Sequence, residues 1–425
     1  MTSIPNPFRE SQEDESVPSL PSCSSILERL GERFDACGSL GLVIVDASFL
    51  EVIERRNGDQ ARRSALKALG NLVQKVTERT LKESDLVMNG EAGRNEIWVV
   101  FLREGEDAAL VRQEIPNFEV ALKRLIEQNA GKAFYPHLRQ APSVAIGSEV
   151  CLRNPRFSTE TQIIRAAELA RRDLRLSLQV EDRERRRRFR EMLFERRIYS
   201  VYEPIVEVNS RVVFGYEALV RGPEKSEFMT PLTLFGAAEQ YDMVYELDCL
   251  CRSSGLSGAI DFPEGTKLFL NILPTAFHDP NFRAERLIKT LEKCELSPTD
   301  VVFEISEQES IENFSVFKEA RDNLRALGFQ FALDDMGSGY AGLEALLEIS
   351  PEYIKMDRAF VTGVDEDSAR QDLLSTLLTL AEKMGSKVIG EGLDTIEELE
   401  MLGKLGIHFG QGWLFGHATP LRARD

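Results

Sequence analysis

The chain has 425 residues, of which 43% are hydrophobic and 29% charged, so it is long enough for two ordinary globular domains. Its formal net charge of -18 excludes generalised binding to nucleic acid or to anionic lipid, which needs clustered positive charge. No apolar run approaches the ~20 residues of a membrane helix and the N-terminus lacks the apolar core of a signal peptide, so we expect a cytoplasmic protein that contacts neither DNA nor membrane.

The first segment, residues 1–25, is rich in Ser, Pro, Asp and Glu and holds few apolar side chains. A segment of this composition cannot bury enough apolar surface to offset the entropy that is lost on folding. We therefore interpret residues 1–25 as a disordered tail.

Residues 26–180 contain predicted strands and helices in the order β-α-β-β-α-β, followed by one more helix. The strands are expected at residues 40–46, 85–87, 96–102 and 142–147, and the helices at 61–80, 106–128 and 160–175. This order is that of the split ferredoxin-like arrangement. We expect one sheet with helices on one face.

This half resembles the GGDEF family of diguanylate cyclases over roughly residues 40–176. The hairpin that carries the family motif reads G-R-N-E-I at residues 93–97, and Asp46 is the one acid on the first strand. Lys82 replaces the arginine of the family's R-x-x-D product site, which removes the planar fork that binds phosphate or guanine through two hydrogen bonds. The resemblance implies a degenerate GGDEF domain that regulates or dimerises, with GTP or a protein as its partner.

Residues 181–198 connect the two halves and carry a run of arginines. Phe189, Met192 and Leu193 fall at helical spacing, which predicts one helix with an apolar stripe and a basic face. We interpret this segment as a solvated linker helix that docks on the following domain. A signalling coupler or a patch for an acidic partner is the alternative.

The second half, residues 199–425, contains seven short apolar runs that each end in a polar or charged residue and alternate with helical stretches. The end residues are Glu217, Asn271, Glu304, Asp334 with Asp335, Lys355, Glu391 and Gln411. Such alternation predicts repeated βα units, and a parallel barrel gathers the carboxyl ends of its strands at one mouth. Carboxylates, amides and one amine that meet there are typical of a metal-assisted hydrolytic centre.

This region resembles the EAL-domain family of cyclic di-GMP phosphodiesterases from Tyr202 to Pro420. The motifs are E-A-L at 217–219, D-D-M-G-S-G-Y at 334–340, I-K-M-D at 354–357, G-E-G-L-D-T at 390–395 and Q-G-W-L-F at 411–415. Each motif is a weak match, but their order and spacing together are specific. The resemblance implies a TIM-like (β/α)8 barrel and a phosphodiesterase that hydrolyses cyclic di-GMP to 5′-pGpG, lowering this second messenger in bacterial signalling.

The resemblance also implies a site for two ions of Mg2+ or Mn2+, which prefer oxygen ligands. The implied ligands are Glu217, Asn271, Glu304, Asp334, Asp335 and Glu391. Asp334 is expected to bridge the two ions. Together the ions neutralise a phosphate oxygen and activate water, and Glu217 and Glu391 count as catalytic for this reason.

Other side chains are expected to handle the water and the substrate. By resemblance Lys355 lies against the attacking water, and Gln411 and Glu307 support that water and the loop at 334–340. The expected contacts with cyclic di-GMP are Arg221, Glu203, Leu219 and Asp357, with Arg221 on a phosphate. Relatives commonly dimerise through the barrel, so we expect a homodimer.

Three positions depart from the family pattern without removing a metal ligand. Glu203 stands where the family has Gln and brings negative charge near an anionic substrate. Met336 replaces Phe in the metal loop, and Asp394 replaces Glu after Glu391.

Two other interpretations stay open. In the first interpretation, the chain is a catalytically inactive cyclic di-GMP receptor or a protein-interaction scaffold. Inactive relatives, however, typically lose metal-binding acids, and this chain keeps them. The second is an unrelated barrel hydrolase, such as a glycosidase with two acids. Asn271, Lys355 and the double Asp at 334–335 are more ligands than a carboxylate pair requires.

Overall fold

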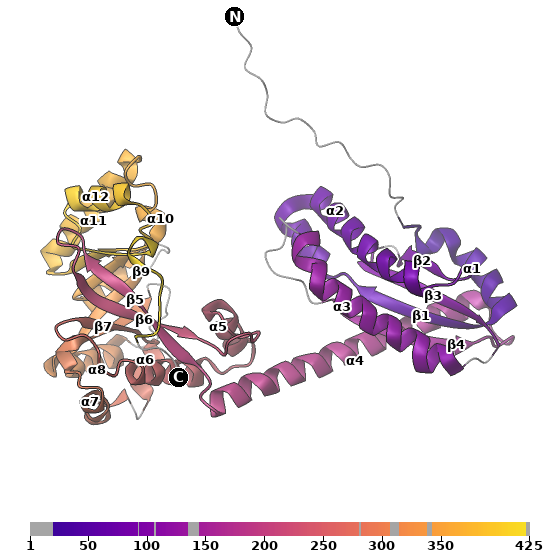
Figure 1. The fold of residues 1–425 in the computed structure, drawn as a ribbon, viewed down its shortest axis with the longest axis horizontal. Helices are drawn as coiled ribbons and strands as arrows, with labels where there is room; N and C mark the ends of the chain where they lie inside the picture. Colours follow the sequence, from indigo (N-terminus) through magenta and orange to yellow (C-terminus); the bar gives the residue numbers. More distant parts are fainter. Residues whose placement is uncertain are drawn as a thin grey trace, which may run out of the picture. The chain divides into compact units, whose positions relative to one another are not determined.

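The computed structural model describes residues 20–91, 93–105, 108–134, 144–279, 282–306, 314–337 and 342–421 (Figure 1). They form two compact units that divide between Glu184 and Arg185. Within these ranges no helix is both long and apolar enough to cross a membrane. Most of the predicted tail lies outside the described residues, but its last part belongs to the fold. Asn89 donates hydrogen bonds to the carbonyls of Leu20 and Pro21, and helix α1 (Cys23–Cys37) begins within the predicted tail. The tail prediction was therefore wrong for residues 20–25.

The first unit is built on a sheet with the strand order β2-β3-β1-β4, and all neighbours are antiparallel. The strands are β1 (Gly38–Asp46), β2 (Leu86–Asn89), β3 (Glu96–Glu104) and β4 (Ile146–Leu152). The predicted order β-α-β-β-α-β and its ferredoxin-like arrangement are confirmed by this topology.

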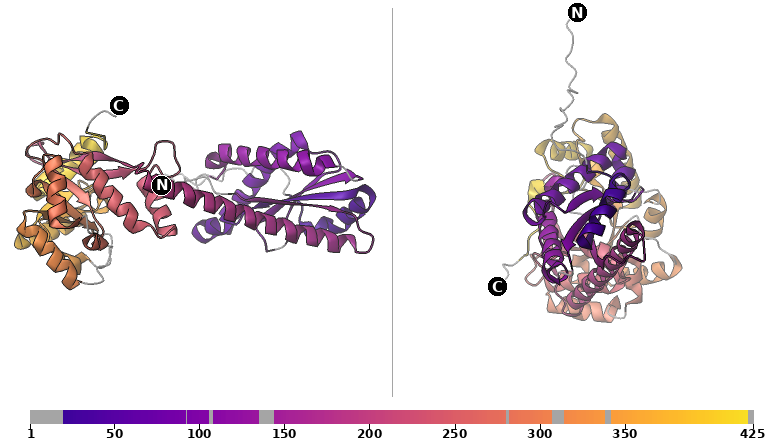
Figure 2. Two further views of the ribbon diagram at one scale, coloured as in Figure 1. Left: turned by 90° about the horizontal axis from the view of Figure 1, so that it is seen from below. Right: turned by 90° about the vertical axis from the view of Figure 1, so that its right-hand side faces the viewer.

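Helices cover both faces of this sheet, as Figure 2 shows, so the prediction of helices on one face was wrong. One face packs against α2 (Phe49–Thr80) and α3 (Ile115–Ala133), which continues the short π-helical turn η1 (Leu110–Glu114), while the other packs against α1 and α4 (Thr159–Phe194). The cause is visible in β1, where Val43 and Val45 point to one core and Leu42 and Ile44 to the other.

Helix α4 is one continuous helix where the sequence predicted two separate ones. Its first part packs Ala166 and Ala170 against the sheet of the first unit. Its last part buries Phe189 and Met192 against Phe228 and other residues of the second unit, as their helical spacing predicted.

The second unit is a closed barrel with the strand order β10-β11-β12-β5-β6-β7-β8-β9. The strands are β5 (Tyr199–Glu207), β6 (Val213–Arg221), β7 (Lys267–Asn271), β8 (Val301–Ser306), β9 (Gln330–Met336), β10 (Tyr353–Met356), β11 (Lys387–Gly390) and β12 (Phe409–Gln411). The predicted barrel is confirmed, and the seven predicted runs are β6 to β12, which follow one another in parallel.

Strand β5 is antiparallel to both β6 and β12, so the expectation of an entirely parallel barrel was wrong. The connection between β5 and β6 consists of residues 208–212. A parallel neighbour needs a crossover of a dozen or more residues, and this short hairpin can therefore join only antiparallel strands.

Helices surround the barrel and bury its outer wall in a large apolar core. They are α5 (Pro231–Gln240), α6 (Val244–Ser257), α7 (Ala284–Lys293), α8 (Phe314–Ala326), α9 (Gly342–Ile349), α10 (Arg358–Val361), α11 (Ser368–Met384) and α12 (Ile396–Leu405). Short 3-10 turns at η2 (Pro274–His278), η4 (Pro298–Asp300) and η5 (Trp413–Phe415) complete the connections.

Candidate metal centre

Six barrel strands, β7 to β12, place their candidate residue two positions beyond an apolar side chain that fills the barrel interior, whereas Glu217 on β6 follows Gly215. The pairs are Phe269 and Asn271, Val302 and Glu304, Ala332 and Asp334, Tyr353 and Lys355, Ile389 and Glu391, and Phe409 and Gln411. Because side chains alternate along a strand, residues two apart share a face. The apolar layer therefore closes the barrel beneath a cup of polar side chains at its mouth.

Lys355 lies at the centre of this cup and is 1% exposed. Its Nζ lies 3.0 Å from Glu217 Oε2, 3.0 Å from Glu304 Oε1, 3.3 Å from Asp334 Oδ1 and 2.7 Å from Glu391 Oε1. Burial disfavours the charged amine, but these carboxylates outweigh it and hold the pKa of Lys355 well above its ordinary value. The lysine is therefore the counter-ion of these four carboxylates.

Glu217 on β6 is a carboxylate of the cup that accepts hydrogen bonds from several neighbouring side chains. It accepts hydrogen bonds from Lys355 Nζ at 3.0 Å, from Gln411 Nε2 at 2.7 Å and from Asn271 Nδ2 at 2.9 Å. Burial alone would raise its pKa, but Lys355, Gln411 and Asn271 hold the pKa of Glu217 below the ordinary value. The structure thus brings these four predicted residues together.

Glu304 and Asp334 contrast with Glu217, because Glu304 Oε1 and Asp334 Oδ1 share the ammonium group of Lys355, at 3.0 and 3.3 Å, and within the described residues no amide donates to them. Glu304 is 0% exposed, and apart from the ion pair with Lys355 neither of its carboxylate oxygens has a hydrogen-bond partner within the described ranges; the same holds for Asp334 Oδ1. Burial, and then repulsion by Glu217, raises the pKa of Glu304 well above its usual range. Buried acceptors with so few donors are costly, so these oxygens fit a bound cation.

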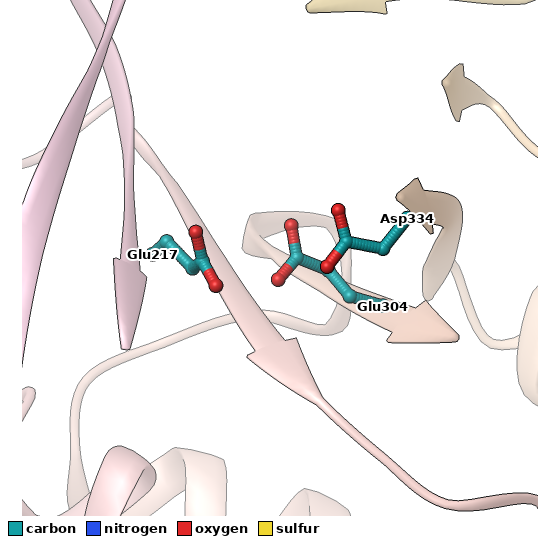
Figure 3. Close-up of side chains that lie close together, drawn as sticks. All are labelled: Glu217, Glu304 and Asp334. Atoms are coloured by element: carbon teal, nitrogen blue, oxygen red, sulfur yellow. The ribbon is translucent and has the colours of Figure 1, made fainter. Parts of the chain in front are cut away.

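The carboxylates form two clusters that share one residue. Ligand oxygens of Glu217, Glu304 and Asp334 lie within 4.8 Å of one another, and those of Asp334, Asp335 and Glu391 do the same. Figure 3 shows Glu217, Glu304 and Asp334 with their carboxyl groups facing one another. The two clusters would each suit a divalent cation, with Asp334 belonging to both, since carboxylate oxygens are the ligands that hard cations prefer.

A β-bulge explains how the neighbouring residues Asp334 and Asp335 both reach the cup. The register between β9 and β10 shifts between Ile354 and Met356, and Asp335 has a positive φ of 57°. A bulge interrupts the alternation of side chains and redirects one of them. Ser306 Oγ, 3.3 Å from Asp335 Oδ2, supports the carboxylate in this position.

The predicted substrate residues surround the cup. Leu219 and Arg221 follow Glu217 on the same face of β6, and the half-buried Arg221 guanidinium donates to the carbonyl of Val220 at 2.8 Å. Asp357 follows β10, where its side chain caps α10 by accepting from the Ala359 amide at 2.7 Å. Glu203 accepts from Gln411 Nε2 at 2.9 Å. Glu307 and residues 338–340 lie outside the described residues.

Glu398 is a supporting residue that the sequence analysis missed. It is 4% exposed and accepts hydrogen bonds from the backbone amides of Gly363, Asp394 and Thr395. These bonds outweigh the effect of burial and lower its pKa. Glu398 thereby anchors the segment that follows Glu391. The capping box of Thr395 and Glu398 at the start of α12 was readable from T-x-x-E.

Comparisons with known proteins agree with this geometry. The family described as "EAL domain" matches residues 186–418, more than half of the chain. The probable cyclic di-GMP phosphodiesterase PdeN of Escherichia coli (strain K12) is 28% identical over 233 residues, which cover 52% of this chain and 44% of PdeN. The blue light- and temperature-regulated antirepressor BluF of the same strain is 28% identical over 221 residues, 52% of this chain and 54% of BluF.

The chain thus spans about half the length of the curated relatives it matches. Among solved structures, the EAL enzyme Bd1971 with cAMP and cyclic di-GMP bound has a TM-score of 0.51 and 20% identity, with coverage of 79% of this chain and 92% of that chain. At this identity the likeness concerns the fold alone.

Proposed function

The chain belongs to the EAL domain family, and from this membership we propose that it is a metal-dependent phosphodiesterase that hydrolyses cyclic di-GMP to 5′-pGpG. One observation carries the proposal: two clusters of carboxylates share Asp334, and one lysine, Lys355, is the cation that pairs with Glu217, Glu304, Asp334 and Glu391 in the described structure. A receptor that only binds nucleotide has no need for such a costly arrangement.

The proposed ions are Mg2+ or Mn2+, held by Glu217, Asn271, Glu304 and Asp334 on one side and by Asp334, Asp335 and Glu391 on the other. When bound, such ions neutralise a phosphate oxygen and make water a nucleophile near neutral pH. The amide nitrogen of Asn271 donates to Glu217, so its oxygen is the atom that would serve as a ligand.

The side chains of the cup have separate tasks in the proposed reaction. Lys355 donates a hydrogen bond to the attacking water and thereby orients its lone pair toward phosphorus. The carbonyl oxygen of Gln411, which is buried and accepts no hydrogen bond within the described ranges, holds a proton of the same water. Arg221 binds a phosphate of the substrate, and Leu219 and Asp357 line the nucleotide. Glu307 would support the loop after Asp335.

For the N-terminal unit we propose a degenerate GGDEF domain that regulates the barrel and makes no cyclic di-GMP. In support, Glu96, the acid of its G-R-N-E-I hairpin, is buried and accepts from Arg171 Nε at 3.0 Å and from Trp98 Nε1 at 2.9 Å. A carboxylate engaged in this way is not free to hold a metal. The same proposal includes a GTP or protein partner for this unit, a homodimer through the barrel and a cytoplasmic location.

The alternative is a receptor or scaffold without turnover. The similarity to an antirepressor supports this alternative. Purified protein incubated with cyclic di-GMP and Mg2+ or Mn2+ should yield 5′-pGpG, which chromatography separates from the substrate. EDTA and the Glu304→Gln variant should each abolish the product. Undiminished substrate at high enzyme and metal concentration would favour the receptor. Labelled GTP should yield neither cyclic di-GMP nor 5′-pGpG.

A further inference from the structure

Glu203 introduces a carboxylate beside the candidate metal ligands. It lies on the antiparallel strand β5, directly opposite Glu217 on β6. Since β5 runs against the other strands, Glu203 precedes the interior residue Ile205 by two positions and faces the same cup.

Gln411 joins the two carboxylates through one nitrogen. Its Nε2 donates to Glu203 Oε2 at 2.9 Å and to Glu217 Oε2 at 2.7 Å. Only the NH2 group of an amide can lie between two carboxylates, because the carbonyl oxygen has no proton to offer either of them. The two carboxylate oxygens are therefore no farther apart than these two hydrogen bonds laid end to end.

The charge on Glu203 is not neutralised in the way that the other carboxylates are. Lys355 pairs with Glu217, Glu304, Asp334 and Glu391 but not with Glu203. Within the ranges that the structure describes, Glu203 forms no ion pair, and its hydrogen-bond donor is the neutral amide of Gln411. Because Glu203 is half-buried, its field is screened less than that of a surface carboxylate.

We infer that Glu203 sets the specificity of the cup for a phosphodiester over a phosphomonoester, so that it disfavours the product more than the substrate. This inference rests on the proposed function. Hydrolysis breaks the bond between phosphorus and the 3′ oxygen, forms a bond from phosphorus to the water oxygen and leaves one water proton on the 3′ oxygen. The other water proton is largely lost to solvent near neutral pH, because a phosphomonoester carries a charge of about -1.5 to -2 there.

The reacting phosphate thus gains about half to one negative charge beside Glu203, while the rest of the dinucleotide keeps its charge. Divalent cations held by the cup would attract both forms of the phosphate, but the Glu203 carboxylate would repel the monoester more strongly because the monoester carries more negative charge. Glu203 should therefore weaken the binding of 5′-pGpG and speed its release, at a smaller cost to substrate binding.

The test compares Glu203→Gln with Glu207→Gln. The first change removes the charge but keeps an oxygen that can accept from Gln411, so folding should be preserved. The second makes the same change at an exposed position of the same strand, at the opposite end of the barrel. The ligands are 5′-pGpG and a phosphorothioate analogue of cyclic di-GMP that resists hydrolysis, each titrated calorimetrically with Mg2+ at low ionic strength.

Glu203→Gln should lower the Kd of 5′-pGpG by roughly 3- to 10-fold and that of the diester analogue by less than about 2-fold, because screening reduces the effect of one charge. Glu207→Gln should change the Kd of neither ligand. Added salt should reduce the difference in Kd for 5′-pGpG between the unmodified protein and Glu203→Gln. An equal change for both ligands, or none, would overturn the role of Glu203 while the proposed function stands. If neither ligand binds to the unmodified protein, the proposed function fails and this inference with it.

Discussion

The ammonium nitrogen of Lys355 lies 2.7 Å from Oε1 of Glu391, which comes from the neighbouring strand β11. This contact is shorter than the contacts of Lys355 with Glu217 on the far side of the cup and with Asp334, at 3.0 and 3.3 Å. Lys355 therefore touches both carboxylate clusters at once. A single lysine holds together a cup whose acids would otherwise repel one another.

Replacing Lys355 by Met tests this position. Turnover of cyclic di-GMP should fall at least ~100-fold, the low end of what a positioned proton-handling group contributes. The metal-free variant should also lose about 3–5 kcal/mol of stability, because buried carboxylates lose their counter-ion. Urea unfolding in EDTA measures the second effect, and divalent metal should restore much of the loss. The control for both measurements is Lys387→Met, which replaces an exposed lysine at the start of β11. Unchanged turnover in the Lys355 variant would contradict its role.

Metal removal and the Glu304→Gln variant should have opposite effects on stability. Mg2+ or Mn2+ at about 100 times its Kd should stabilise the unmodified protein by about 2.7 kcal/mol, which EDTA reverses. Glu304→Gln removes one of the four carboxylates that share the single charge of Lys355, so repulsion in the cup decreases and the metal-free variant should be more stable than the metal-free parent. The variant should lose most of the metal-induced gain. Thermal unfolding with and without metal decides the matter, and a destabilised metal-free variant would count against a cation site at Glu304.

The barrel and most of the cup were predictable from sequence because each strand repeats one local pattern. An apolar residue such as Phe269 or Tyr353 is followed two positions later by a polar one such as Asn271 or Lys355. Period-two alternation places both on one face, and parallel strands bring these faces to one mouth. Neither step requires long-range information.

Features that depend on pairing between distant segments were not predictable in the same way. The bulge that lets both Asp334 and Asp335 reach the cup exists only in the register of β9 against β10. The bond of Gln411 to Glu203 depends on β12 pairing with β5 at barrel closure. The continuity of α4 was not predictable from apolar periodicity, because residues 175–183, which lie between its packed parts, are exposed and carry no apolar stripe that would mark them as helix.

The stability of the metal-free protein should fall as pH rises. Burial is the main cause that raises the pKa of Glu391, to about 8, and repulsion by Asp334 and Glu217 adds to it. In the unfolded chain a glutamate loses its proton near pH 4.5, so between about pH 4.5 and 8 the folded state binds more protons. The slope should reach up to about 1.4 kcal/mol per pH unit for one proton.

Urea unfolding in EDTA from pH 5.5 to 8.5 measures this slope, and Glu391→Gln should flatten it. Bound divalent metal should reverse its sign, because ligand carboxylates must be deprotonated and metal affinity therefore increases with pH. A metal-free protein that gains stability over this range would show that Glu391 is ionised in the folded state.

The last prediction concerns Arg103 in the N-terminal unit. Its guanidinium donates to Asp85 Oδ2 at 2.9 Å and to Glu114 Oε2 at 2.7 Å, and the Arg103 and Asp85 side chains are 4% and 0% exposed. Arg103→Leu leaves Asp85 buried without its partner and should cost about 3–5 kcal/mol in this unit.

The double variant Asp85→Asn with Arg103→Leu should recover part of this loss, because no charge then stays buried. Arg63→Leu, which removes an exposed partner of Asp59, should change stability little. Hydrogen exchange resolves the two units, so strands β1 to β4 should lose protection while the barrel keeps it. If Arg103→Leu lowered stability as little as Arg63→Leu, Asp85 would have to reach solvent or another cation in the folded protein. The buried pair of Arg103 and Asp85 would then not hold β3 to the segment before β2.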